Sequence, residues 1–205
     1  MRGRGKSPFP LFHLEYEKCR LENEGGMNVE ATSAIDVKAL FNLTYGMYIV
    51  STEWEGRKNG QIANSVMQVT ATPNTVAVCL NRDNYTWELL EKSGKFSVTV
   101  LEEDVPMTFI GTFGFKSGRD IDKFASCNWA RGLEGTPVVT DHALAWIEAR
   151  VFNRIDVFTH SVFFGEVLSS SCLKQGCPLT YANYHLVKKG KSPKSAPTYI
   201  LNAVK

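Results

Sequence analysis

Short apolar runs that end at turn residues recur along most of this chain, and few stretches have the period of a helix. Residues 45–52 alternate between apolar and polar positions, which is typical of a half-buried strand. Residues 143–151 carry apolar side chains on both faces, which fits a strand of a closed barrel or of a subunit interface. Helix is expected only at residues 36–43, 86–91 and 105–111. The sequence therefore predicts a mainly β protein built as an antiparallel barrel.

Residues 59–65 read Asn-Gly-Gln-Ile-Ala-Asn-Ser and follow the first of these strands. We expect residues 66–70 to form a second strand, joined to the first in a hairpin through residues 54–60. A Gly followed by small and amide-bearing residues lets backbone N–H groups approach the edge of a ligand closely. An ordinary hairpin with Asn64 and Ser65 on its solvent-exposed face explains the same periodicity. This segment alone therefore leaves both interpretations open.

Further motifs downstream favour the ligand-binding interpretation. They are the apolar strand 76–80 with its polar turn 81–86, the strand 93–101, the Phe-Gly-Phe-Lys-Ser-Gly-Arg-Asp-Ile-Asp-Lys-Phe segment 113–124, the strand 163–167, and the Pro-Leu-Thr-Tyr at 178–181. Together with residues 59–65, they resemble the flavin reductase-like, FMN-binding split-barrel family, in its flavoredoxin or rubredoxin-coupled NAD(P)H:flavin reductase type. Gln61 and Ile62 stand where the usual family segment has Met and Thr.

The resemblance implies a six-stranded antiparallel Greek-key split barrel with a few short helices, formed by residues 36–187. It also implies a homodimer with the flavin bound near the subunit interface. Residues 1–35 are expected to be a disordered or loosely docked N-terminal extension. Residues 188–205 form a Lys/Pro-rich tail with the composition of a solvated linker, which in some relatives leads into a fused rubredoxin. The chain has no Cys-x-x-Cys pair, so we expect any rubredoxin to be a separate protein.

The resemblance further implies FMN as the cofactor and NADH or NADPH as the co-substrate. FMN presents a polar ring edge and a phosphate with about two negative charges, which suit amides, hydroxyls and a guanidinium. The expected cofactor residues are Gln61, Ile62, Ala63, Asn64, Ser65 and Val66 along the ring, Asn81, Arg82, Tyr85 and Thr86 in the first polar turn, Ser117, Arg119 and Lys123 in the second, and Tyr181.

His160 is the candidate catalytic residue, because many family members carry Gly-Asp-His at this place before the last barrel strand. The histidine would contact flavin or nicotinamide. Thr159 replaces the aspartate of that motif, which removes the carboxylate that would orient the imidazole ring. A surface histidine with its polar groups satisfied is the alternative interpretation of this residue.

Composition excludes several other classes of protein. The chain has 23 basic and 21 acidic residues, and a formal charge of +2 is too small for nucleic-acid binding by bulk electrostatics. No apolar run approaches the roughly 20 residues that cross a bilayer, and no signal peptide is visible, so we expect a cytoplasmic protein without a membrane partner. Five cysteines at irregular spacings fit reduced thiols, and no metal site is expected. Cys172 and Cys177 leave an occasional disulfide open.

Three functions remain compatible with the sequence. The leading hypothesis is an FMN-containing flavin reductase that takes hydride from NAD(P)H and passes electrons to rubredoxin, a flavodiiron protein or free flavin. The second is a flavoredoxin-like FMN electron carrier without nicotinamide activity, and the third is a non-catalytic FMN-binding module. The absence of a catalytic triad does not separate them, because the flavin itself carries hydride transfer.

Overall fold

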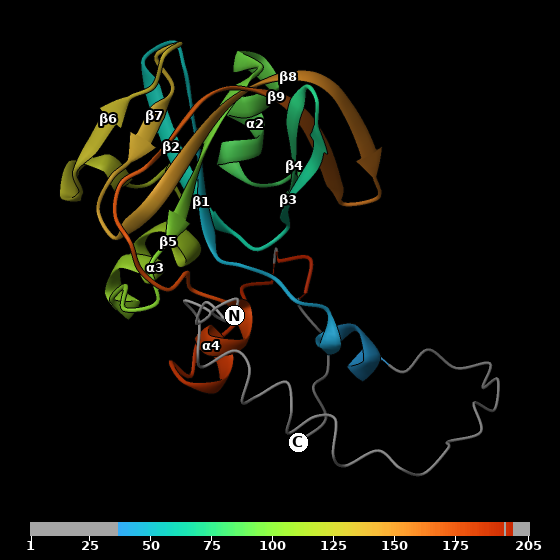
Figure 1. Ribbon diagram of the computed structural model, residues 1–205, viewed down its shortest axis with the longest axis vertical. Helices are drawn as coiled ribbons and strands as arrows, with labels where there is room; N and C mark the ends of the chain where they lie inside the picture. Colours follow the sequence, from blue (N-terminus) through green and yellow to red (C-terminus); the bar gives the residue numbers. More distant parts are fainter. Residues whose placement is uncertain (1–36, 195, 199–205) are drawn as a thin grey trace, which may run out of the picture. The chain divides into compact units, whose positions relative to one another are not determined.

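The computed structural model describes residues 37–194 and 196–198 of the chain. Its strands are β1 (Tyr48–Trp54), β2 (Arg57–Ala63), β3 (Val66–Ala71), β4 (Asn74–Asn81), β5 (Lys95–Leu101), β6 (Trp129–Arg131), β7 (Pro137–Val139), β8 (Ala143–Val157) and β9 (His160–Cys172). Seven of them form one sheet in the order β2-β1-β5-β8-β9-β4-β3, and β6 pairs with β7 in a second (Figure 1). All neighbouring strands in both sheets are antiparallel. The expected N-terminal extension, residues 1–35, lies outside the described residues.

The helical segments are short and lie between the strands. They are the 3-10 helices η1 (Val37–Asn42) and η2 (Lys123–Ser126) and the α-helices α2 (Tyr85–Ser93), α3 (Met107–Phe115) and α4 (Tyr181–Leu186). The three expected helices are therefore present with shifted ends. Helix α4 was not predicted, because six residues are too few to show a helical period. No helix in the described part of the chain is long and apolar enough to span a membrane.

The mainly β, antiparallel fold class is confirmed, but the expected first hairpin is wrong. Glu55 and Gly56 have φ angles of 48° and 76°, so the chain reverses within two residues and β1 pairs with β2. Strand β3 pairs with β4 instead. The large sheet has seven strands rather than six, and residues 57–63, which were expected largely as a connection, form one of them.

Strand β1 is buried on both of its faces. Val50 belongs to one apolar cluster, which contains Trp87 of α2 and Phe163 of β9. Ile49 belongs to a second cluster, which includes Phe113 of α3. Successive side chains of a strand point to opposite faces, so one strand joins two cores. Its position therefore determines where β2, α2 and α3 lie.

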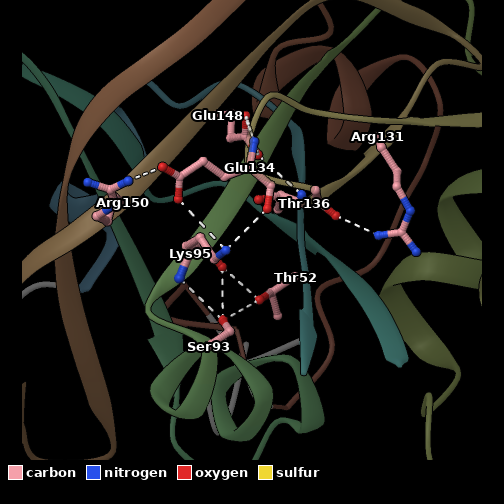
Figure 2. Close-up of polar contacts among 9 residues, drawn as sticks. Thr52, Ser93, Lys95, Arg131, Glu134, Thr136, Glu148 and Arg150 are labelled. Carbon is pink, nitrogen blue, oxygen red and sulfur yellow. Dashed lines mark hydrogen bonds and ion pairs between the residues drawn. The ribbon is translucent and has the colours of Figure 1, made fainter. Parts of the chain in front are cut away.

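A fully buried carboxylate holds the connection between β6 and β7 (Figure 2). Both carboxylate oxygens of Glu148 accept from the backbone N–H of Glu134 at 3.2 Å, and Oε1 also accepts from the backbone N–H of Thr136 at 3.2 Å. A Cβ on Gly132 would overlap this carboxylate, so the loop encloses it closely. The Glu134 side chain in turn pairs with Arg150. Glu148 thus orders a loop whose backbone donors would otherwise be unpaired.

We predict that Glu148→Gln lowers the free energy of unfolding by about 2 kcal/mol, because an amide replaces a charged acceptor of several backbone N–H groups. Urea unfolding monitored by circular dichroism measures the change. Glu166→Gln is the matched control, since Glu166 is exposed on β9. Equal destabilisation by both substitutions would contradict this account of Glu148.

Candidate functional site

A cavity of about 330 Å³ lies where the end of β2, the turn after β4, the loop after α3, and α4 meet. Its wall includes eleven of the side chains that the sequence predicts for a cofactor site, drawn from four separate parts of the chain. They are Gln61, Ile62, Ala63, Asn64, Asn81, Tyr85, Thr86, Ser117, Arg119, Lys123 and Tyr181. Tertiary structure thus gathers residues that the sequence could only place in separate motifs.

The β2 wall carries buried acceptors that lack hydrogen-bond donors within the described residues. These are Asn59 Oδ1 and Gln61 Oε1. The other side of the Asn59 amide is occupied, because its Nδ2 donates to Thr86 Oγ1 at 2.9 Å. A Cβ on Gly118 would overlap the Asn59 amide, so only glycine lets the loop after α3 approach this closely. Buried acceptors without donors are costly, and a ligand with N–H or O–H groups would satisfy them.

Lys123 supplies a buried positive charge to the cavity. Its side chain is 3% exposed, and Nζ donates to the carbonyl oxygens of Gly60 at 2.9 Å and Phe113 at 3.2 Å. Neither partner is a carboxylate, so the charge is not neutralised within the described residues. Burial lowers the pKa of Lys123 from 10.5 to about 8. An anionic ligand in the cavity would supply the missing negative charge.

Arg119 lies at the rim of the cavity rather than inside it. The guanidinium stacks over the Tyr85 ring at 4.7 Å and pairs with Glu88 at 2.8 Å, and its side chain is 51% exposed. Arg119 and Lys92 hold the pKa of the Glu88 carboxyl below its usual value. The Arg119 backbone N–H donates to Ser117 Oγ at 3.1 Å. Arg119 can therefore reach a ligand only by sharing or leaving Glu88.

Four of the expected residues do not line the cavity. Ser65 and Val66 lie beyond the bend that ends β2, where Ser65 Oγ donates to Asn64 Oδ1 at 3.1 Å. Arg82 points to the Trp87 ring at 5.8 Å. His160 begins β9 opposite Asn81, and its Nδ1 shares a hydrogen bond with Thr159 Oγ1 at 2.8 Å. The roles assigned to these residues stay predictions.

The structure adds cavity residues that the sequence motifs did not single out. Asn59, Cys79 and Phe113 are three of them, and the C-terminal residues 191–193 and 196–197 also form part of the wall. Asn59 opens the quoted Asn-Gly motif, so its position was a usable signal. The C-terminal residues offered no such signal, because their Lys- and Pro-rich composition is typical of a solvated linker.

Fold and site together define a mainly β, barrel-type protein with a polar cavity that contains the buried Lys123 cation. A family model described as flavin reductase like domain matches residues 40–190, and the chain therefore belongs to this family.

Two curated relatives are similar over most of the chain. The ferric-chelate reductase (NAD(P)H) of Archaeoglobus fulgidus is 48% identical over 165 residues, which are 80% of this chain and 98% of that protein. The high molecular weight rubredoxin of Moorella thermoacetica is 46% identical over 171 residues, which are 83% of this chain and 75% of that protein. Among solved structures, the flavin reductase HpaC complexed with NADP+ is 25% identical with a TM-score of 0.62, over 72% of this chain and 92% of that one.

We predict that the buried lysine makes stability rise with pH above 8. Between pH 8 and about 10.5 the folded chain loses the Lys123 proton while the unfolded chain keeps it, so the unfolded state binds more protons and raising the pH favours folding. The gain is up to about 3 kcal/mol. Urea unfolding from pH 7 to 10 of the unaltered chain and Lys123→Met measures it as their difference. Exposed Lys92→Met is the control, and a pH-independent difference for Lys123→Met would refute the prediction.

Proposed function

We propose that the protein is an FMN-containing oxidoreductase that takes hydride from NADH or NADPH and passes electrons to a separate acceptor. The observation that carries this proposal is the pairing, in one cavity, of an amide-lined strand end with the buried Lys123 cation. The relatives' names agree with it, because one is a reductase that uses NAD(P)H and one solved neighbour holds NADP+.

The residues present fit FMN in chemistry and in size. A cavity of about 330 Å³ lies within the range of about 300 to 1,000 Å³ that is usual for small-molecule sites. The orphaned acceptors of Asn59 and Gln61 suit the donors of a heterocyclic ring or of a ribityl chain. Lys123 and the hydroxyl-bearing turns suit a phosphate. The amide and hydroxyl groups alone would suit a neutral ligand equally well. The buried cation of Lys123 is what favours an anionic ligand such as FMN.

Each wall of the cavity takes part in holding the cofactor. Residues 61–64 would hold the ring edge, partly through backbone groups, and the turn 81–86 with Asn81, Tyr85 and Thr86 would contact the phosphate or the ribityl chain. Residues 117–119 would complete the phosphate site from the rim. Tyr181 borders the site from α4.

The bound FMN supplies the chemistry of hydride acceptance and onward electron transfer. The protein's residues supply the electrostatics and the exclusion of water. Phe113 and Ile110 form an apolar part of the wall, which would limit the water inside the cavity once the cofactor is bound. Lys123 favours negative charge in the cavity, whether on a phosphate or on a reduced ring. No protein nucleophile is required, and His160 would act only as a contact to the cofactor or the nicotinamide.

The electron acceptor is a rubredoxin, a flavodiiron protein, a ferric chelate or free flavin. The relatives named for rubredoxin and for ferric-chelate reduction support acceptors of these kinds. A small acidic carrier would be attracted by the lysines that follow α4, since Lys189, Lys191 and Lys194 lie within a few residues of the cavity wall.

We predict that the purified protein binds one FMN per chain and that NADH or NADPH bleaches the flavin absorbance under anaerobic conditions. Stopped-flow mixing with each nucleotide measures the rate, and subsequent addition of rubredoxin or a ferric chelate measures reoxidation. If the protein binds FMN but neither nucleotide reduces it, the protein is an FMN electron carrier and not a reductase. A protein without affinity for FMN would refute both.

The protein also acts as a homodimer in this proposal, with the cavity close to the subunit interface. Cross-strand neighbours on β3, β4, β9 and β8 place one row of apolar side chains on the outer face of the sheet. We call this row the outer apolar face; its apolar members are Met67, Ala77, Cys79, Phe152, Ile155, Val157, Val162 and Phe164, of which Ala77 is already buried. Asn153 and His160 lie on the same face of the sheet. Met67 and Phe152 are 61% and 62% exposed, which is unusual for side chains of this size.

The outer apolar face continues into the cavity, because Cys79 belongs to both. A second copy of the chain, placed on this face by a two-fold axis, would bury the exposed side chains against the same residues of its partner. It would also add a wall to the cavity. A self-complementary apolar row is what such an interface requires.

We predict that Ile155→Lys converts the dimer to a monomer and weakens FMN retention, because a lysine in the centre of the face would be buried without a counter-charge. Size-exclusion chromatography with light scattering measures the mass. Leu133→Lys is the matched control, since Leu133 is 75% exposed on the connection between β6 and β7. A monomeric unaltered chain that retains FMN would overturn the proposed dimer alone.

A further inference from the structure

The chain that follows α4 returns to the cavity and is tied to it by side-chain hydrogen bonds. Tyr181 Oη lies at 2.5 Å from Thr198 Oγ1 and also bonds to Ser192 Oγ. Tyr184, which is 3% exposed, donates its hydroxyl to the carbonyl of Lys191 at 2.9 Å. We call residues 190–194 and 196–198 the C-terminal strap.

The C-terminal strap also reaches the strand end that forms the opposite wall. Asn64 Nδ2 donates to Thr198 Oγ1 at 3.2 Å, and Asn64 is 6% exposed. Asn64 and Tyr181 are 117 positions apart in sequence, yet both bind the same threonine hydroxyl. The strap therefore bridges two walls of the cavity, and residues such as Pro193 and Pro197 line the space between them.

The hydrogen bonds of the strap form one continuous series with a consistent direction. At one end, the Asn64 amide can only donate to Thr198. At the other, the Gly190 carbonyl can only accept, so His185 Nδ1 donates to it at 2.9 Å, and Nε2 of the same ring lies 3.4 Å from Ser192 Oγ, from which it can accept in this tautomer. The hydroxyls of Thr198, Tyr181 and Ser192 can then each donate to the next group.

Such a series leaves each of its donors paired, so removing one hydroxyl interrupts the link between the two walls. The strap has few other fastenings. Two of its members, Pro193 and Pro197, lack a backbone N–H, and no strand pairs with it in the described part of the chain. The segment is thus held by side chains rather than by a backbone ladder.

We infer that the C-terminal strap is a retaining wall for the flavin, fastened by the Asn64–Thr198–Tyr181–Ser192 series, which keeps FMN bound as a resident group. This inference rests on the proposed function. FMN that enters or leaves between the β2 end and α4 must displace the strap, because the strap bridges these two walls. Acceptors then take electrons from bound flavin, while reduced flavin is not released as a diffusing product. Tyr181 and Thr198 are positioning residues in this scheme, since they act through the strap and through Asn64.

The test is the rate at which FMN leaves the full-length protein, followed by the recovery of free flavin fluorescence after dilution to a concentration at which released FMN does not rebind. We expect Tyr181→Phe and Thr198→Val each to release FMN about tenfold faster than the unaltered chain, which corresponds to about 1.4 kcal/mol. A chain that ends at Lys189 should release it faster still. Tyr45→Phe is the matched control, because the Tyr45 ring contacts the edge of Tyr181 at 6.0 Å while its hydroxyl makes no hydrogen bond within the described residues. A chain that ends at Thr198 is the control for truncation.

A second readout does not depend on the variants. Trypsin cleavage after Lys191 should be slower with FMN bound than without it, because a closed strap protects its own backbone. Circular dichroism and melting temperature verify that each variant is folded.

The outcomes separate the two proposals. Tight FMN binding with the same release rate in the Lys189-terminated and unaltered chains would overturn the strap and leave the proposed function intact. Faster release from Tyr181→Phe alone would also overturn it, because the tyrosine would then act directly on the flavin. An unaltered chain that binds no FMN would overturn the proposed function, and with it the strap's role toward flavin.

Discussion

The burial of β1 on both faces is the constraint on which the rest of the structure depends. Ile49 and Val50 are adjacent in sequence and fully buried, yet they belong to different apolar clusters. One cluster fills the space between the sheet and α2, and the other lies under α3 and α4. A strand shared by two cores cannot slip by one residue without exchanging the two sets of side chains. The β2 end that carries the amides is therefore held in register with β1.

The cavity lies beside the second cluster, and its polarity comes from groups that the fold leaves without full partners. Lys123 donates only to carbonyls, and the buried acceptors of Asn59 and Gln61 lack donors within the described residues. Each of these groups costs stability when the cavity holds no complementary ligand. Unpaired buried groups of this kind are found at functional sites, where a bound ligand pairs with them and removes the loss of stability. By contrast, the carboxylate of Glu148 is fully buried and satisfied by backbone donors, which is the pattern of a structural group.

The C-terminal strap and the outer apolar face both border the cavity, and neither belongs to the barrel's core. The strap covers one side of the cavity from within the chain, through hydroxyls that meet at Tyr181. The outer apolar face adjoins it at Cys79 and would close it from a second copy. The strap and the outer apolar face therefore control how a ligand enters the cavity, while the strands of the barrel form its fixed walls.

The sequence by itself determined the class of fold and eleven of the residues that line the cavity, because alternation along single strands and the short motifs that carry the family resemblance are local properties. Residues 61–64, 85–86, 117 and 119 are predicted in this way, and all of them line the cavity. The pairing of β1 with β2 was mispredicted, because it depends on two consecutive positive φ angles at Glu55 and Gly56, and Glu55 rarely adopts that conformation.

Only the tertiary structure decided which cation is enclosed and what covers the cavity. Arg119 and Lys123 were both expected at the second polar turn, yet Glu88 and Tyr85 hold Arg119 at the rim, and Lys123 is the buried cation. The burial of a side chain depends on neighbours that are distant in sequence, so a local sequence pattern does not predict it. The same reason applies to Thr198. A polar residue in a linker-like tail belongs to no periodic pattern. Its place beside Asn64 follows from a hydrogen bond between residues that are 134 positions apart in sequence.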